Sequence, residues 1–205
     1  MGIKAIVFDF GNVVSRFDHW LTTDRLASYT RLGRDAIHAY LFGGPLEDDY
    51  DCGRISTEAF LCQVRDRLGL TCSDEVVARA WADIFQPDPD VAALLPRLGR
   101  HYRLLLASNT NELHSQQFIR QFADTLRHFD GIVLSHAIGV RKPNSAFFEH
   151  CRRQAGCAAA ECLFIDDLPA NVAGARACGW HGIVYTGAAA LEEQFLRLGI
   201  QETGP

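Results

Sequence analysis

The chain has 205 residues, with 20 Lys or Arg against 25 Asp or Glu and 48% hydrophobic residues, which is typical of a soluble globular protein built as one domain with an insertion or as two small domains. A formal net charge of -5 without a basic cluster argues against nucleic acid or an anionic membrane as the main partner and favours a small molecule. The apolar runs fall far short of the roughly 20 residues that cross a bilayer, and no signal-peptide pattern precedes the first strand-like run. The seven cysteines are an odd number without zinc or redox spacing, so we expect reduced thiols and a cytoplasmic location.

Taken in chain order, short runs of β-branched and aliphatic residues alternate with segments of helical periodicity. Such runs are typical of buried parallel strands, and we expect strands at Ile3–Phe8, Tyr102–Ala107, Gly131–Leu134, Cys162–Ile165 and Gly182–Tyr185. The expected helices between them are Asp90–Leu98, Leu113–Arg127, Ser145–Ala155 and Asn171–Cys178. Strand alternating with helix predicts a Rossmann-like, doubly wound α/β fold with a parallel sheet.

The alternation is interrupted between the first and second strands. From Ser15 to about Phe85 the sequence shows helical periodicity and no convincing strand. The prolines of the segment 86–89 indicate the return hinge, because they cannot lie inside a helix. We therefore predict a helical cap over residues 15–94, inserted into a core formed by residues 1–14 and 95–205. Its expected helices are Trp20–Thr30, Arg34–Phe42, Thr57–Leu68 and Asp74–Ile84.

Polar residues follow the predicted strands at the edge where ligands bind in open α/β sheets. The loop after the third strand leads to the segment 139–143, which contains Lys142. We expect three carboxylates, this lysine and a small cluster of hydroxyl and amide groups to converge on one edge of the sheet. The segments directly after the other strands are Asp9-Phe10-Gly11-Asn12, Ser108-Asn109-Thr110-Asn111 and Asp166-Asp167, with Asn171 shortly after the last.

Crowded carboxylates repel one another unless a cation holds them, and hard oxygen ligands suit Mg²⁺. Mg²⁺ usually completes its octahedron with water and substrate phosphate oxygens. Ser108, Asn109 and Lys142 supply the donors and the positive charge that a phosphoryl group needs during transfer. One carboxylate can then attack phosphorus and form an aspartyl phosphate. The residues thus predict a Mg²⁺-dependent reaction on a small phosphorylated metabolite.

Together, the segments 8–13, 106–110, 139–143 and 164–167 with Asn171 resemble the four signature motifs of the haloacid dehalogenase-like (HAD) hydrolase superfamily, and the inserted helices resemble its cap. The resemblance implies that Asp9 is the nucleophile and a metal ligand. It implies that Ser108, Asn109 and Lys142 bind phosphate, with Lys142 steadying the transition state. Asp167 and the backbone carbonyl of Gly11 would contact the metal. Asp166 would act through water or Lys142, and Asn171 would orient the acidic loop.

One position departs from the pattern of the superfamily. Most of its phosphatases have a second Asp two residues after the nucleophile, as general acid and base, and this chain has Gly11 there. Such assistance is commonly worth about 10² to 10⁴ in rate. We therefore expect either a substrate with a good leaving group, such as a sugar 1-phosphate or an acyl phosphate, or a proton donor from the cap. Asp18 and His19 are the nearest candidate donors, and Arg16 and Arg54 are candidate cations for substrate recognition.

The segments 9–12 and 53–56 also resemble a bacterial subgroup that includes sugar-1-phosphate (α-glucose-1-phosphate) phosphatases. Two other functions stay open. A 2-haloacid dehalogenase also lacks the second Asp, but usually has Ser and Asn where this chain has Asp166 and Asp167. A non-catalytic regulatory or binding protein of the same fold is supported by Gly11 and opposed by the retention of Asp9 and Lys142. The sequence sets neither the physiological substrate nor the oligomeric state.

Overall fold

A five-stranded parallel sheet forms the centre of the protein, which a computed structural model describes for residues 2–200. Each neighbouring pair of strands runs parallel. The spatial order reverses at β1, which lies between β4 and β6, and ligands bind at such a switch point in open α/β sheets. The predicted doubly wound α/β fold is therefore confirmed. In spatial order the strands are β5 (Gly131–Leu134), β4 (Arg103–Ser108), β1 (Ala5–Phe8), β6 (Cys162–Asp166) and β7 (His181–Val184).

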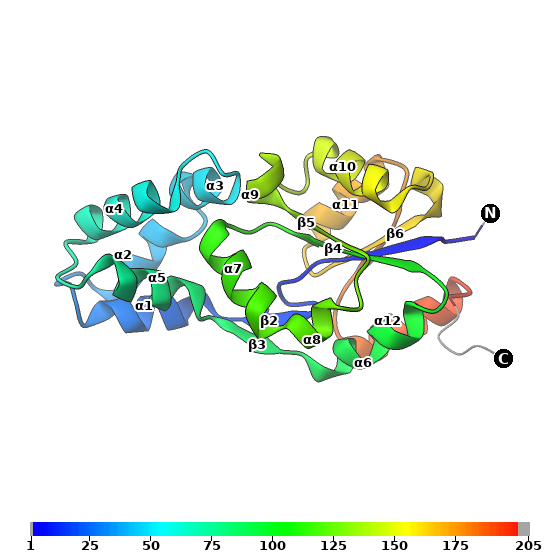
Figure 1. The fold of residues 1–205 in the computed structure, drawn as a ribbon, viewed down its shortest axis with the longest axis horizontal. Helices are drawn as coiled ribbons and strands as arrows, with labels where there is room; N and C mark the ends of the chain where they lie inside the picture. Colours follow the sequence, from blue (N-terminus) through cyan, green and yellow to red (C-terminus); the bar gives the residue numbers. More distant parts are fainter. Residues whose placement is uncertain (1, 201–205) are drawn as a thin grey trace.

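Side chains along the strands alternate between two apolar layers, because successive residues of a strand point to opposite faces. In β1, Ile6 and Phe8 belong to one layer, whereas Ala5 and Val7 belong to the other. No helix among residues 2–200 combines the length and the apolar character needed to span a membrane. The first layer is covered by α6 (Pro89–Leu98), α7 (Glu112–Gln121), α8 (Ala123–Leu126) and α12 (Ala188–Arg197), and the second by α10 (Ser145–Ala155) and α11 (Pro169–Ala177) (Figure 1).

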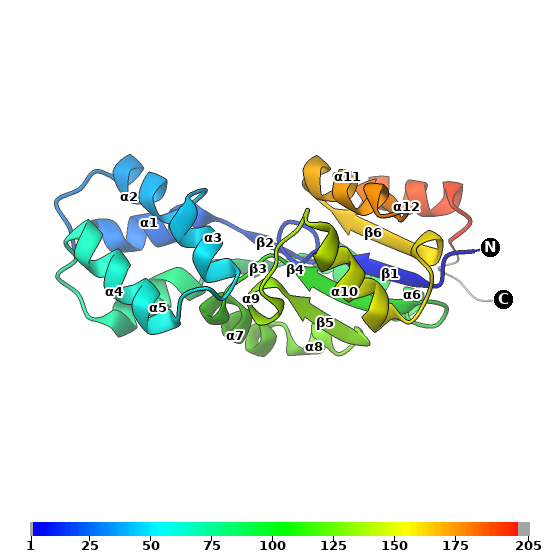
Figure 2. The ribbon, with the colours of Figure 1, turned by 90° about the horizontal axis from the view of Figure 1, so that it is seen from above.

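A helical segment, which we call the cap, lies beyond the carboxyl ends of the strands (Figure 2). It has its own apolar cluster, in which Leu26, Phe60 and Trp81 are almost completely buried. Local sequence sets the ends of its longest helix: Ser56 Oγ accepts a hydrogen bond from the Ala59 N–H, and Gly69 ends the helix with a left-handed φ of 57°. The cap helices are α1 (His19–Ala27), α2 (Arg34–Leu41), α3 (Pro45–Asp51), α4 (Thr57–Leu68) and α5 (Asp74–Ala82).

The connection between cap and core differs from the expectation. The strands β2 (Ser15–Phe17) and β3 (Phe85–Pro87) pair as an antiparallel ribbon where no strand was predicted. Helix α6 packs Val91 and Leu94 into the layer on the sheet, so the expected boundary at residue 94 falls inside a core helix. The chain crosses between core and cap at the ribbon instead.

Two helical predictions also need correction. Helix α3 was not expected, because it follows Gly43 and Gly44 and is short. The helix expected over Leu113–Arg127 is interrupted at Phe122, whose φ and ψ of −107° and 23° leave the helical region. The small helix α9 (Ser135–Ile138) and the 3-10 turn η1 (Ala159–Glu161) complete the connections.

Candidate active site

Asp9 lies directly after β1, the central strand of the sheet, and its side chain is nearly buried. Its Oδ1 accepts a hydrogen bond of 2.7 Å from the Phe10 N–H and lies 2.8 Å from Lys142 Nζ. The Asp9 N–H donates to the Ile165 carbonyl at 2.8 Å, which ties the turn to the neighbouring strand β6. The backbone of two strands therefore fixes this carboxylate at the edge of the sheet.

Lys142 reaches the same point from the loop after α9. Its buried ammonium group lies 2.8 Å from Asp9 Oδ1 and 2.7 Å from Asp166 Oδ2, and it donates to the Ala107 carbonyl at 2.9 Å. An ammonium group has three donors, and all three are satisfied here. Burial lowers the pKa of Lys142, but the charges of Asp9 and Asp166 outweigh it and raise the pKa. Lys142 is therefore a fixed positive charge beside Asp9.

The two consecutive aspartates have different surroundings. Asp166 is fully buried, and its carboxylate accepts hydrogen bonds from Asn171 Nδ2 at 3.0 and 3.1 Å and from the Leu168 N–H at 2.9 Å, in addition to the contact with Lys142. Asp167 is less buried and lines the cavity, where its Oδ2 accepts from Asn12 Nδ2 at 3.2 Å. Asp166 thus positions Lys142, whereas Asp167 faces the space in front of Asp9.

The carboxylates of Asp9, Asp166 and Asp167 each offer an oxygen within 4.8 Å of the others. Burial raises the pKa of Asp9 to about 7, Lys142 opposes this rise, and the two other aspartates add to it. Burial also raises the pKa of Asp167. Three carboxylates with a single lysine therefore leave negative charge uncompensated, and all the donors are hard oxygens. This donor set fits a divalent cation such as Mg²⁺.

Ser108 ends β4 beside this cluster, and Asn109 follows it. The Asn109 side chain donates through Nδ2 to the Lys142 carbonyl at 3.0 Å and accepts through Oδ1 from the Lys142 N–H at 2.8 Å. Its amide group therefore holds the segment 139–143, which we call the lysine loop. The backbone of Asn109, rather than its side chain, remains available to a ligand. Ser108 lines the cavity, with Oγ 3.5 Å from the Asn109 carbonyl.

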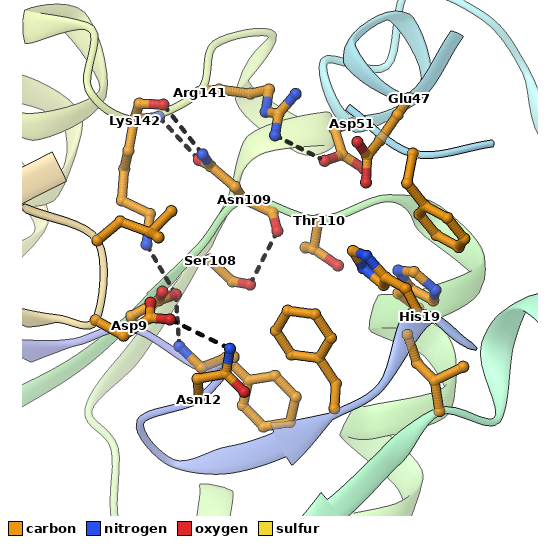
Figure 3. A pocket seen from close by; sticks show the side chains of 18 of the residues that line it. Asp9, Asn12, His19, Glu47, Asp51, Ser108, Asn109, Thr110, Arg141 and Lys142 are labelled. Atoms are coloured by element: carbon orange, nitrogen blue, oxygen red, sulfur yellow. Dashed lines mark hydrogen bonds and ion pairs between the residues drawn. The ribbon is translucent and has the colours of Figure 1, made fainter. Parts of the chain in front are cut away.

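A cavity of about 470 Å³ extends from these residues to the cap. Figure 3 shows Asp9 and Lys142 at one end and Glu47 and Asp51 of helix α3 at the other, with Thr110 between them. Such a volume is sufficient for a small organic ligand. The cavity thus combines an anionic cluster that fits a cation with space for a second chemical group.

A family model of haloacid dehalogenase-like hydrolases matches residues 3–179. The chain belongs to this family. Among curated proteins, it is 28% identical over 189 residues to Sesquiterpene phosphatase astK of Aspergillus oryzae, covering 91% of this chain and 92% of the relative. It is also 28% identical over 184 residues to D-ribitol-5-phosphate phosphatase of Bacteroides thetaiotaomicron, covering 83% and 85% of the two chains.

The solved structures match the fold of this HAD-like hydrolase. A HAD family enzyme of Bacteroides thetaiotaomicron, in complex with magnesium and inorganic phosphate, aligns with a TM-score of 0.79 and 23% identity over 90% of this chain and 95% of that one. The L-2-haloacid dehalogenase of Xanthobacter autotrophicus aligns with a TM-score of 0.65 and 21% identity, over 95% and 83% of the two chains. At these identities the alignments show a common fold.

Of the four cap residues singled out from the sequence, only His19 lines the cavity of this HAD-like hydrolase. Burial lowers the pKa of His19 to about 4, so its ring is neutral at pH 7. Asp18 is exposed and accepts a hydrogen bond from the Trp20 N–H, which caps helix α1. Arg16 pairs with Asp88 at 3.0 Å. Arg54 is exposed and pairs with Asp48 and Asp49.

Helix α3 and the lysine loop hold the cap against the core through residues that the sequence did not single out. Asp51 Oδ1 accepts from Asn111 Nδ2 at 2.9 Å, its Oδ2 lies 3.3 Å from Arg141 Nη2, and its carbonyl accepts from Ser135 Oγ at 2.6 Å. Burial raises the pKa of Asp51 to about 7, against the opposing charge of Arg141. The sequence gives no local signal for the role of Arg141, because its acidic partners Asp48 and Asp51 come from a helix far away in the chain. Asn12 was in a recognised motif, but nothing in the sequence indicated its bond to Asp167.

Gly11 occupies a confined position. A Cβ atom on it would lie 2.6 Å from Phe17 Cε1 and 3.0 Å from Phe17 Cδ1. Phe17 belongs to the ribbon strand β2 and itself lines the cavity. The ring thus fills the space in which the second Asp of most related phosphatases would begin.

Proposed function

We propose that this HAD-like hydrolase is a Mg²⁺-dependent phosphatase of a small phosphorylated metabolite, with Asp9 as the nucleophile. The observation that carries the proposal is the position of Lys142, which bridges Asp9 and Asp166 while Asp167 faces the same cavity. One carboxylate is thereby held beside a fixed positive charge, and another is available to a cation. The two relatives named above as phosphatases support a phosphate ester as the substrate class.

Asp9 and Lys142 carry the first half of the reaction. A carboxylate oxygen of Asp9 attacks phosphorus in line with the ester bond, and a new oxygen–phosphorus bond forms as the bond to the alcohol oxygen breaks. The alcohol oxygen leaves with the bonding electron pair and takes up a proton. Lys142 and the Ser108 hydroxyl oppose the negative charge on the phosphoryl oxygens. Asp9, Asp167 and the Gly11 carbonyl would hold Mg²⁺, which would supply further positive charge near these oxygens.

Water carries the second half of the reaction. It attacks the phosphorus of the aspartyl phosphate, the bond to the Asp9 oxygen breaks, and inorganic phosphate leaves while the carboxylate is restored. Gly11 has no side chain to protonate the alcohol or to deprotonate the water. The proposal therefore favours an alcohol that leaves without strong protonation, such as the anomeric oxygen of a sugar 1-phosphate.

Hydrolysis of p-nitrophenyl phosphate tests this function, because its good leaving group needs little acid assistance. We expect turnover with Mg²⁺, loss of turnover in EDTA, and loss in Asp9→Asn. Asp124→Asn is the matched control, since its side chain is 99% exposed. If the wild type and Asp9→Asn are equally inactive on this ester and on a panel of phosphorylated metabolites, a non-catalytic role replaces the proposal.

The same preparation separates phosphatase from dehalogenase chemistry. Both reactions use an aspartate such as Asp9, but the carboxylate pair Asp166 and Asp167 favours cation-assisted phosphoryl transfer. Chloride release from 2-chloropropionate that survives EDTA would overturn the proposal. Rates on the 1-phosphate and 6-phosphate of one sugar test the leaving-group argument, which fails if the 6-phosphate is hydrolysed equally well or faster.

A further inference from the structure

The end of the cavity away from Asp9 carries polar groups that the reaction at phosphorus does not use. Glu47 and Arg141 line this end, and Thr110 lies between it and Asp9 (Figure 3). His19 and Phe42 line the same cavity. The rings of His19 and Phe42 are stacked, with centroids 4.0 Å apart and an interplanar angle of 8°. One wall is therefore aromatic, whereas another carries hydrogen-bonding groups.

Thr110 is 3% exposed, and its Oγ1 has no hydrogen-bond partner among residues 2–200. Its backbone N–H donates to Ser135 Oγ at 2.8 Å, and the single hydroxyl proton of Ser135 is shared between the carbonyls of Asp51 at 2.6 Å and Thr110 at 2.9 Å. These contacts hold the backbone of Thr110 in place. A buried hydroxyl without a partner costs free energy, and in Figure 3 this one points into the cavity.

Arg141 offers a second unused donor. Its Nη1 donates to Asp48 Oδ1 at 3.1 Å, and its Nη2 lies 3.3 Å from Asp51 Oδ2. These two ion pairs fix the plane of the guanidinium group. Its Nε is buried and has no partner in the described part of the chain. Since Arg141 lines the cavity, we assign this donor to a ligand group that accepts a hydrogen bond.

Glu47 provides the complementary acceptor. Its Oε2 accepts from the Gly43 N–H at 2.7 Å, which orients the carboxylate at the wall of the cavity. With Asp48 and Asp51 it places three acidic groups beside the single guanidinium of Arg141, so a second phosphate or a carboxylate on the substrate would be repelled.

The remaining choices differ in their hydrogen bonding. An apolar chain would leave Thr110 Oγ1 and Arg141 Nε without partners. An ammonium group would suit Glu47, but it has no lone pair for Arg141 Nε. A group of neighbouring hydroxyls donates to Glu47, accepts from Arg141 and exchanges a hydrogen bond with Thr110. Its C–H face can lie on the aromatic wall.

We propose that Thr110, Glu47 and Arg141 are the specificity-determining residues of this enzyme and bind a neutral, polyhydroxylated leaving group. This inference rests on the proposed phosphatase function. Thr110 follows the phosphate-binding Ser108 and Asn109, and Arg141 precedes Lys142, whereas Glu47 belongs to the cap. The residues that select the substrate therefore lie on both sides of the boundary between cap and core.

The test compares kcat/KM for glucose 1-phosphate with kcat/KM for p-nitrophenyl phosphate, in Mg²⁺. Loss of one neutral hydrogen bond should lower this ratio about 3- to 10-fold in Thr110→Val, and loss of a charged one about 10- to 100-fold in Glu47→Gln. Thr110→Ser keeps the hydroxyl and should retain most of the ratio. Thermal unfolding checks that each variant is folded.

Each variant has a matched control in the cap. Thr23 is also buried, and its Oγ1 has no partner within residues 2–200, but it does not line the cavity. Glu58 is exposed on α4. Thr23→Val and Glu58→Gln should leave the ratio unchanged. Wild-type kcat/KM should be lower for an isoprenyl monophosphate and for phosphoethanolamine than for glucose 1-phosphate.

The outcomes separate the two proposals. Without turnover of p-nitrophenyl phosphate or of any ester in the panel, the phosphatase function fails, and this inference fails with it. With turnover, the inference alone is overturned if Thr110→Val and Glu47→Gln keep the wild-type ratio. It is also overturned if the isoprenyl or ethanolamine ester is preferred, or if no hydroxylated ester is hydrolysed.

Discussion

Replacing Gly11 by Ala adds only the Cβ atom that the Phe17 ring excludes. This atom would lie 2.6 Å from Phe17 Cε1, whereas ordinary contact begins at 3.4 Å, so the ring has to retreat. The ring packs against His19 and Phe85, with centroids 4.8 and 6.3 Å away, so a shift toward the cavity disturbs both contacts. Overpacking of this kind costs about 1 to 3 kcal/mol. We expect Gly11→Ala to lower the free energy of unfolding by this amount.

The partner substitution Phe17→Ala removes the obstacle. The φ of Gly11 lies outside the left-handed region, so Ala at this position should then be neutral or stabilising by about 0.4 to 1 kcal/mol. Equilibrium urea unfolding of the wild type, both single variants and the double variant gives the coupling energy, which we expect to be about 1 to 3 kcal/mol. Gly2→Ala is the control, since its Cβ would meet nothing within 4 Å. If Gly11→Ala costs the same with and without the Phe17 ring, the steric reasoning is wrong.

Three further predictions concern buried polar groups. Lys142→Met should lower the free energy of unfolding by about 3 to 5 kcal/mol, because it leaves two buried carboxylates unpaired. Equilibrium unfolding in urea measures this loss, and a value below about 1 kcal/mol would contradict the prediction. The pKa of Asp51 rises from 3.8 to about 7 on folding, so the folded protein binds a proton that the unfolded chain releases, and stability falls as the pH rises from about 4 to 7. Asp51→Asn should flatten this slope, and the exposed Asp35→Asn should not. Trp81→Phe removes the 3.1 Å hydrogen bond from Nε1 to Asn111 Oδ1. It should lower the melting temperature by an amount equivalent to about 1 to 3 kcal/mol. An unchanged melting temperature would show that this hydrogen bond contributes nothing to stability.

The sequence predicted the sheet and the convergence at its edge because both depend on local patterns. Asp9, Ser108 and Asp166 each follow a buried apolar run or end one. The carboxyl ends of parallel strands share one edge, so placing the strands was enough to bring these residues together. Lys142 followed from its position in a recognised motif rather than from a strand end.

Contacts between distant segments could not be predicted in the same way. The ribbon pairs Ser15 with Pro87, and each of its strands has three residues, which are too few to show a hydrophobic periodicity in the sequence. Arg141 depends on acidic partners in α3, and the restriction at Gly11 depends on the position of a single ring of β2. Such features come from tertiary packing, and the local sequence carries no signal for them.

The antiparallel ribbon has a consequence for how the cap can vary. Because Ser15 lies opposite Pro87, the chain leaves the core and returns to it at one point. The distance between these two ends is therefore the same whatever segment is inserted between them. Loop-closure entropy grows slowly, by about 0.6 kcal/mol for each doubling of the inserted length. A chain with residues 18–84 replaced by a short turn should still unfold cooperatively, as measured by circular dichroism in urea. The cap can thus be exchanged while the strands that precede Asp9 and Asp167 keep their register.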